Sequence, residues 1–437
     1  MSREIKSVAV IGGGTMGTGI AGLCAQTDHQ VLLLDINQEA VNKAKERIIN
    51  GRPPAIDEPE KIDNIQFGTI DRDLERIAEY DWICEAVVED LSTKRTIFEK
   101  LEPLRRDQSV ISTNTSGILL DEITKGMPER LRKDIAVTHF FNPVKVMRLL
   151  ELVPGAETTP DVIKTLRDFT RDQLGKGVVN GKDTVNFIGN RIGCFWMMSG
   201  LHYAQKALTD GLSMEQIDAL MSNPVGLPPT GLYGLIDLVG LDVMDLVGKN
   251  LSVNLPAGDM GMEFVALPKP IQEMLGRGQI GRKAGSGFYR VEKLEDGSRK
   301  TEIYDLVTEK WRESEKFQLK DSQSGLEVII ADDTAGNFAW RIMGGTLCYA
   351  ADLIPEIADD IINVDRAMRW GYAWSKGPFE IIDALGADRF IEHVKRDGIS
   401  LPKMLKVLTS AGAKSFYRNN GQEYLGRDGQ YHPTPPE

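Results

Sequence analysis

The chain has 437 residues, of which 41% are hydrophobic and 27% charged, a composition typical of globular proteins with two or three domains. Its formal net charge of −12 argues against a nucleic-acid-binding protein, which normally presents a basic surface. A polyanionic ligand must therefore be held by a local basic patch or by helix termini.

The four cysteines are far apart and form no C-x-x-C pair, so we expect neither a metal site nor a disulfide framework. Scattered apolar thiols suit a reducing compartment, and we expect a cytoplasmic protein. The chain begins almost directly with a predicted strand, and it has no apolar run of 18 residues. We therefore expect no signal peptide and no membrane span.

A glycine-rich turn near the N-terminus organises the first part of the chain. Residues 8–11 are an apolar β-type run, and Gly12, Gly14 and Gly17 follow with the spacing G-x-G-x-x-G before a helix-compatible run at 18–25. The first glycine permits a tight turn, the second allows close approach of a pyrophosphate, and the third lets the helix pack against the strand. The free N–H groups at the helix N-terminus favour phosphate binding.

A second apolar run, 31–34, ends on Asp35, 18 residues after Gly17. An acidic side chain at this place can hold both ribose hydroxyls of NAD and repels the 2′-phosphate of NADP. The sequence therefore predicts an NAD site, although a glycine-rich turn that binds nothing is the alternative.

Strand-like and helix-like segments then alternate as far as residue 183. We predict strands at 65–67, 81–87, 109–112 and 135–141, and helices at 38–50, 92–104 and 118–124. This alternation is typical of an α/β, doubly wound, Rossmann-type parallel sheet, in which ligands bind at the carboxyl ends of the strands. We assign residues 1–183 to an NAD-binding domain.

The remainder of the chain is predicted to be helical and internally repeated. Asp183, Arg191, Asp218, Asp237 and Tyr289 recur with the same neighbours as Asp333, Arg341, Asp365, Asp383 and Tyr417. We therefore predict two tandem all-α domains, which we call the first copy (184–328) and the second copy (329–437). Asp296-Gly297 is a turn signal that predicts a hairpin within 292–320. Because the second copy can take the place of a partner subunit, we expect a monomer or a homodimer.

His139 is the histidine best placed for catalysis, because it lies near the carboxyl end of a predicted strand. Glu151 follows after a short apolar run that can return as an adjacent strand, and a carboxylate there would orient the imidazole and stabilise its protonated form. Asn114 and Ser116 follow another strand end, where an amide and a hydroxyl can hold a substrate oxygen, although turn capping explains them equally well.

Several motifs occur together in an order that resembles the L-3-hydroxyacyl-CoA dehydrogenase family, in particular the dehydrogenase part of multifunctional fatty-acid oxidation proteins. They are the glycine turn, Glu85-Ala86-Val87-Val88-Glu89, Ser112-Thr113-Asn114-Thr115-Ser116, His139-Phe140-Phe141-Asn142-Pro143, Glu151, Lys182-Asp183-Thr184 with Asn190-Arg191, and Gly281-Arg282-Lys283-x-Gly285-x-Gly287-Phe288-Tyr289. The resemblance covers nearly the whole chain.

The resemblance implies NAD-dependent oxidation of an L-3-hydroxyacyl-CoA to the 3-oxoacyl-CoA in fatty-acid β-oxidation. It implies that His139 is the general base, Glu151 its partner, Ser116 a hydrogen-bond donor to the substrate oxygen, and Asn190 a substrate contact. It also implies cofactor-side roles for Gly12, Gly14, Thr15, Met16, Gly17, Asp35, Glu89, Asn114 and Asn142. A fused or associated enoyl-CoA hydratase domain is a further expectation.

The sequence departs from the family pattern in two places. Val185-Asn186 replaces Pro-Gly, and Gly231-Leu232-Tyr233 replaces Gly-Pro-Phe, which the second copy keeps as Gly377-Pro378-Phe379. Trp340 stands in the second copy where the first has Asn190, so the second copy is expected to be structural.

Two other functions stay open at this point. The same His–Glu pair suits a related 3-hydroxy acid or sugar-acid dehydrogenase that does not use CoA, and the fold also suits a non-catalytic NAD-binding protein. Lys43, Lys45 and Arg52 are candidates for the CoA phosphates, but a solvated helix face explains them equally well. Acyl chain length is not predicted.

Overall fold

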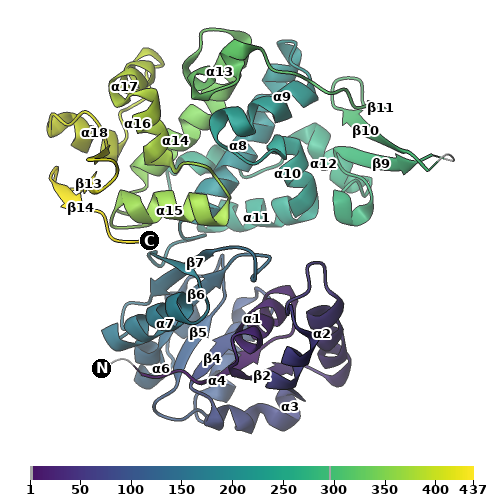
Figure 1. The fold of residues 1–437 in the computed structure, drawn as a ribbon, viewed down its shortest axis with the longest axis vertical. Helices are drawn as coiled ribbons and strands as arrows, with labels where there is room; N and C mark the ends of the chain where they lie inside the picture. The colour runs from purple at the N-terminus through teal and green to yellow at the C-terminus, as the bar shows by residue number, and fades with distance from the viewer. Residues whose placement is uncertain (1–2, 295–296) are drawn as a thin grey trace. The chain divides into compact units, whose positions relative to one another are not determined.

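The computed structural model describes residues 3–294 and 297–437, which divide into two compact units (Figure 1). The first unit runs to Gly189 and also contains Pro355–Asp359 and Glu437, and the second contains Asn190–Ile354 and Asp360–Pro436. Within the described residues, we find no helix with the length and apolarity that a membrane span needs. The four cysteines are buried and free.

The first unit is built on an eight-stranded sheet with the order β3-β2-β1-β4-β5-β6-β7-β8. Its strands are β1 (Ser7–Ile11), β2 (Gln30–Asp35), β3 (Ile65–Thr69), β4 (Trp82–Glu85), β5 (Val110–Thr113), β6 (Ile135–Phe140), β7 (Leu149–Pro154) and β8 (Gly177–Asn180). Strands β1 to β6 are parallel, whereas β7 is antiparallel to β6 and β8 is parallel to β7. The expectation of a parallel sheet therefore holds for β1 to β6 only. The short connection between β6 and β7 has no crossover helix, so the chain returns in the opposite direction.

Helices cover both faces of this sheet (Figure 1). They are α1 (Thr15–Gln26), α2 (Gln38–Asn50), α3 (Ile70–Asp73), α4 (Leu91–Leu101), α5 (Leu120–Thr124), α6 (Glu129–Asp134) and α7 (Pro160–Asp172). Val8 and Val10 of β1 belong to one apolar core together with residues of α1, α2 and α7, and Ala9 and Ile11 belong to another with residues of α4, α5 and α6. Alternate side chains of a strand point to opposite faces, so an uninterrupted apolar run is buried on both.

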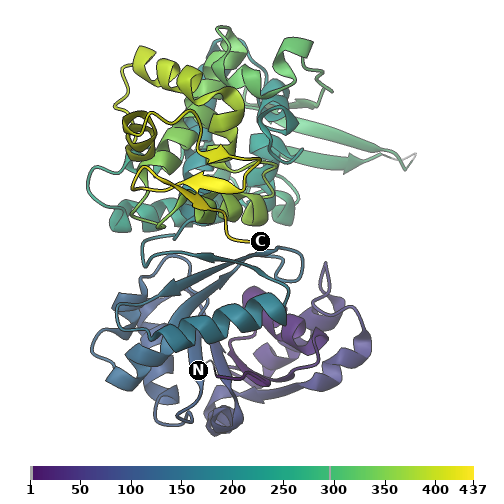
Figure 2. The ribbon, with the colours of Figure 1, turned by 60° about the vertical axis from the view of Figure 1, so that its left-hand side comes forward.

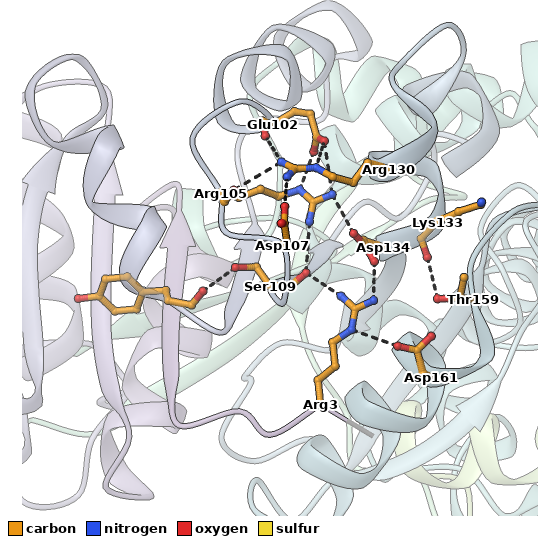
Figure 3. A network of polar contacts seen from close by, with 11 residues as sticks. Arg3, Glu102, Arg105, Asp107, Ser109, Arg130, Lys133, Asp134, Thr159 and Asp161 are labelled. Carbon is orange, nitrogen blue, oxygen red and sulfur yellow. Dashed lines mark hydrogen bonds and ion pairs between the residues drawn. The ribbon is translucent and has the colours of Figure 1, made fainter. Parts of the chain in front are cut away.

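A network of ion pairs lies at the amino ends of β5 and β6 (Figure 3). Arg105 is buried and pairs with Glu102 at 2.6 Å and with Asp134 at 2.8 Å, and Asp134 also pairs with Arg3 at 2.6 Å. Arg3 and Arg105 both donate to the carbonyl oxygen of Ser109. The network joins the segments that precede β5 and β6. It therefore lies at the amino ends of these strands and not at their carboxyl ends.

The second unit contains the remaining helices and two small sheets. The helices are α8 (Gly189–Thr209), α9 (Met214–Leu220), α10 (Gly231–Val239), α11 (Leu241–Asn254), α12 (Lys269–Gly276), α13 (Thr334–Ala339), α14 (Gly345–Asp352), α15 (Ile361–Gly371), α16 (Pro378–Leu385), α17 (Ala387–Arg396) and α18 (Lys403–Ser410). Residue Gly189 of α8 is grouped with the first unit. A capping box opens α9, since Ser213 and Gln216 bond to each other's backbone N–H.

The expectation of two all-α domains is wrong in one respect, because the second unit also contains two small β-sheets. One is formed by β9 (Tyr289–Lys293), β10 (Arg299–Asp305) and β11 (Lys310–Glu313), and the other by β12 (Tyr417–Arg418), β13 (Glu423–Leu425) and β14 (Tyr431–Pro433). Figure 2 shows both, the first in green and the second in yellow. The predicted hairpin is formed by the antiparallel strands β9 and β10, although Asp296 of its turn lies outside the described residues.

The predicted repeat is visible in matching hydrogen bonds. Tyr289 donates its hydroxyl to Asp218 at 2.8 Å, and Tyr417 donates in the same way to Asp365 at 2.7 Å. The carboxylate of Asp237 accepts from two successive backbone N–H groups after the first copy's helices, as Asp383 does in the second. Most of both copies belongs to one compact unit, and the boundaries 184–328 and 329–437 remain a prediction.

Candidate active site

The glycine turn between β1 and α1 has the geometry that its spacing predicts. Gly12 has φ of +107°, and a Cβ there would lie 2.6 Å from the carbonyl oxygen of Ala86. A Cβ on Gly17 would lie 1.8 Å from the carbonyl oxygen of Gly12, so only glycine fits where the helix packs on the turn. A Cβ on Gly14, in contrast, would have no neighbouring atom within 4 Å, so the space beside this glycine is open to a ligand.

The start of α1 and the end of β2 complete this part of the site. The N-cap residue of α1 is Gly14, which makes no side-chain capping bond, so the N–H groups of Thr15 and Met16 at the start of the helix can bind a phosphate. The carboxylate of Asp35 accepts from the N–H of Gly13 at 2.9 Å, which holds it beside the turn. An open phosphate-binding turn with a neighbouring carboxylate fits NAD.

His139 and Glu151 are direct partners across β6 and β7. The imidazole Nδ1 lies 2.6 Å from the carboxylate Oε2, and the two residues are 5% and 0% exposed. A buried carboxylate at Nδ1 selects the tautomer that carries its proton there, which leaves Nε2 as the proton acceptor. The pair is thus prepared for general-base chemistry.

The second carboxylate oxygen of Glu151 is held as firmly as the first. Oε1 accepts from the N–H groups of Ile188 and Gly189, at 3.0 and 2.7 Å, where α8 begins. The rings of Phe141 and Phe187 lie 4.7 and 5.6 Å from the imidazole, centroid to centroid. Hydrogen bonds and apolar contacts therefore fix the orientation of both members of the pair.

The loop after β5 brings the other predicted polar residues to the same edge of the sheet. Asn114 accepts from the N–H of Phe140 at 2.9 Å, which ties this loop to the residue after His139. Ser116 and Gly117 donate their N–H groups to Oε1 of Glu89 at 2.9 and 2.7 Å. Burial raises the pKa of Glu89, but Lys94 and these donors outweigh it, so the pKa lies below its ordinary value and the carboxylate is charged.

Lys94 is a residue that the sequence analysis missed. Its ammonium is 1% exposed and lies 3.0 Å from Glu85, which is 0% exposed, and 3.2 Å from Glu89. The sequence offers one signal for the burial of Lys94, which is its position three residues before Ile97 on the apolar face of a helix. Since a buried ion pair needs both partners, Lys94 holds the motif that ends in Glu89 in place.

The other residues that the sequence analysis names lie outside the contacts described above. Asn142 is exposed at the end of β6, and Asn190 lies in the second unit, where its Oδ1 accepts from Tyr372. Trp340, the counterpart of Asn190 in the repeat, is buried and donates to Asp397 at 2.6 Å, which agrees with a structural second copy. Asn186 has φ of +60°, and asparagine tolerates this region better than most residues, so it can replace the glycine that the family pattern has there.

The other four histidines have structural contacts. They are His29 against Phe169, His202 against the carbonyl oxygen of Ala266, His393 against Trp340, and His432 beside Asp428. Among the histidines, all of which the structure describes, His139 alone lies at the carboxyl edge of the large sheet.

Comparison with known proteins identifies the relatives of this chain. Residues 7–184 match the family model described as 3-hydroxyacyl-CoA dehydrogenase, NAD binding domain, and residues 187–291 match that of 3-hydroxyacyl-CoA dehydrogenase, C-terminal domain. A probable 3-hydroxyacyl-CoA dehydrogenase of Bacillus subtilis is 34% identical over 99% of this chain and 57% of its own length. A putative fatty acid oxidation complex trifunctional enzyme of Rickettsia felis is 33% identical over 97% of this chain and 59% of its own length. The chain thus spans less than two thirds of these relatives.

A solved structure of 3-hydroxybutyryl-CoA dehydrogenase from Escherichia coli has the same fold. It aligns with a TM-score of 0.67 over 92% of this chain and 98% of its own, at 23% identity. The shared fold includes both the sheet and most of the helical region.

Proposed function

The chain belongs to the 3-hydroxyacyl-CoA dehydrogenase family, and from this membership we propose that it oxidises an L-3-hydroxyacyl-CoA to the 3-oxoacyl-CoA with NAD. The observation that carries the proposal is the buried pair of His139 and Glu151 in the unit that also contains the glycine turn. A non-catalytic NAD-binding protein would have no use for a buried, oriented proton acceptor at this edge of the sheet.

In the proposed reaction, Nε2 of His139 takes the proton of the substrate 3-hydroxyl while the C3–O bond becomes a carbonyl. NAD, when bound, is the acceptor of the hydride from C3. The carboxylate of Glu151 stabilises the positive charge that forms on the imidazole, and Ser116 donates a hydrogen bond to the oxygen at C3. Asp35 would hold the ribose hydroxyls of the cofactor, and Asn190 would donate to the thioester carbonyl.

We propose that this reaction serves fatty-acid β-oxidation, together with an enoyl-CoA hydratase that is fused to the chain or associates with it. The name of the Rickettsia relative and the extra length of both relatives support this proposal. We also propose that the protein works in a reducing compartment such as the cytoplasm, and the four free, buried thiols support this proposal.

Initial rates of NADH formation test the proposed substrate. We expect turnover with a series of L-3-hydroxyacyl-CoA thioesters from butyryl to palmitoyl, and little with the D enantiomers or with the free 3-hydroxy acids. Turnover of the free acids alone would replace this proposal by a dehydrogenase that does not use CoA. Binding of NAD with no turnover of either class would indicate a non-catalytic protein.

A further inference from the structure

A hydrogen bond within the second unit joins the two copies of the repeat. Asn190 is the second residue of α8 in the first copy, and Tyr372 follows the end of α15 in the second copy, 182 positions later in the chain. The hydroxyl of Tyr372 donates to Oδ1 of Asn190 at 2.8 Å.

The surroundings of Tyr372 on α8 are shaped to receive its ring. Gly193 lies one turn after Asn190, and a Cβ at Gly193 would lie 2.1 Å from the ring of Tyr372. The thiol of the buried Cys194 is also hydrogen-bonded to the side chain of Tyr372. Asn190, Gly193 and Cys194, which share one face of α8, therefore fix the place of the hydroxyl.

The pair occurs in one half of the repeat only. Trp340 stands where the first copy has Asn190, and Val225 or Gly226 stands where the second copy has Tyr372. Neither of these has a side-chain hydroxyl, and the indole of Trp340 donates to Asp397 instead. Since the other half folds without an equivalent pair, the fold alone does not require a tyrosine hydroxyl bonded to an asparagine amide.

The bond determines which end of the Asn190 amide is available. Its oxygen is occupied as an acceptor, so the amide presents its two Nδ2 hydrogens. A donor is what the carbonyl oxygen of a thioester needs. We propose that Tyr372 is a positioning residue for substrate binding, holding the amide of Asn190 so that Nδ2 donates to the acyl-CoA. The inference rests on the proposed function, because it takes Asn190 to be a substrate contact. Through Tyr372, the second copy then supports a substrate contact that the first copy makes.

Tyr372→Phe tests the proposal, because it removes the hydroxyl and keeps the ring against Gly193. We expect kcat/KM for the acyl-CoA to fall about three- to tenfold, as for the loss of one orienting hydrogen bond, with the Kd of NAD unchanged. Asn190→Ala should lower kcat/KM at least as much, and adding Tyr372→Phe to Asn190→Ala should cause no further loss. Tyr431→Phe is the matched control, since Tyr431 is in the same copy and donates to the carbonyl oxygen of Ser415.

The outcomes separate the inference from the proposed function. If Asn190→Ala lowers kcat/KM but Tyr372→Phe does not, or if the two losses multiply fully in the double variant, Tyr372 has no positioning role and the proposed function stands. If Asn190→Ala leaves kcat/KM unchanged, Asn190 is not a substrate contact and the inference fails, whereas the proposed function itself fails only if the parent does not turn over the acyl-CoA. Melting temperatures of the parent and the four variants, measured in parallel, report any structural effect of the hydroxyl. Tyr372→Phe should leave the melting temperature within a few degrees of the parent, and a large fall would indicate a structural role instead.

Discussion

His139 and Glu151 face each other across two antiparallel strands, so that one hydrogen bond of 2.6 Å joins residues that are 12 positions apart. Strand pairing fixes the distance between their backbones, and burial excludes water from the bond. A shift of the pairing by one residue would point Glu151 to the opposite face of the sheet. The antiparallel return of β7, at the edge of an otherwise parallel sheet, therefore creates the proposed catalytic pair.

Replacement of His139 by Gln should remove the proton acceptor and keep most of the side-chain volume. We expect kcat to fall by roughly a thousandfold or more, with the Kd of NAD within about twofold of the parent. Steady-state rates and titration of NAD by fluorescence measure the two effects. His432→Gln, at a position far along the chain from the site residues, is the control and should retain full activity. A loss of less than about tenfold would exclude His139 as the base.

Replacement of Glu151 by Gln should retain the acceptor for the N–H groups of Ile188 and Gly189 and remove the charge beside the imidazole. We expect kcat to fall by about a hundredfold or more, because the protonated imidazole loses its stabilising partner and the tautomer is no longer selected. The KM for the acyl-CoA should change little. If kcat is retained while the melting temperature falls, the role of Glu151 is structural.

Replacement of Asp35 by Ser should weaken the preference for NAD. The carboxylate beside the glycine turn repels a 2′-phosphate, and the variant lacks this repulsion. We expect kcat/KM with NAD to fall about tenfold and that with NADP to rise. Rates with the two cofactors under the same conditions give the ratio. An unchanged ratio would mean that Asp35 does not contact the ribose.

Gly14 and Gly17 should respond differently to substitution by Ala. A Cβ on Gly17 would overlap the carbonyl oxygen of Gly12, so Gly17→Ala should lower the melting temperature or prevent folding. Gly14→Ala adds a methyl group in open space and should leave the melting temperature within a few degrees of the parent. It should nevertheless weaken NAD binding by about tenfold or more, because the methyl group occupies the approach of the pyrophosphate. Tight binding of NAD by Gly14→Ala would place the cofactor elsewhere.

Lys176 should make the free energy of unfolding depend on pH above about 8. Its ammonium is buried, donates to the carbonyl oxygens of Val144 and Met147, and has its pKa lowered to about 8 by desolvation. Between this value and its unfolded pKa of roughly 10.4, the unfolded chain binds more protons than the folded one, so stability from this group rises with pH.

Urea unfolding of the parent and of Lys176→Met at several pH values isolates this contribution. The difference in free energy of unfolding between the two proteins should move in favour of the parent by on the order of 2 kcal/mol from pH 8 to pH 10. A difference that does not change with pH would show that Lys176 titrates normally in the folded protein.

The features of this protein that depend on neighbouring residues can be predicted from the sequence alone. The spacing of Gly12, Gly14 and Gly17 after an apolar run, and the acid at the end of the next run, follow from local backbone geometry and can be recognised without a fold. Continuous apolar runs likewise indicate strands buried on both faces, and the capping box of Ser213 marks the start of α9. The repeat and the family motifs were also visible, because they are patterns along the chain.

Which distant side chains meet cannot be predicted from patterns along the chain. The register of β6 and β7, the burial of Lys94 between Glu85 and Glu89, and the contact of Tyr372 with Asn190 all depend on packing between segments. Apart from the hairpin of β9 and β10, the sequence does not predict the two small sheets that follow the helices of each copy. Short strands gain most of their stability from the strands they pair with, and this pairing is not visible in a local pattern. Local pattern selects the element, but the free energy of packing selects its neighbours.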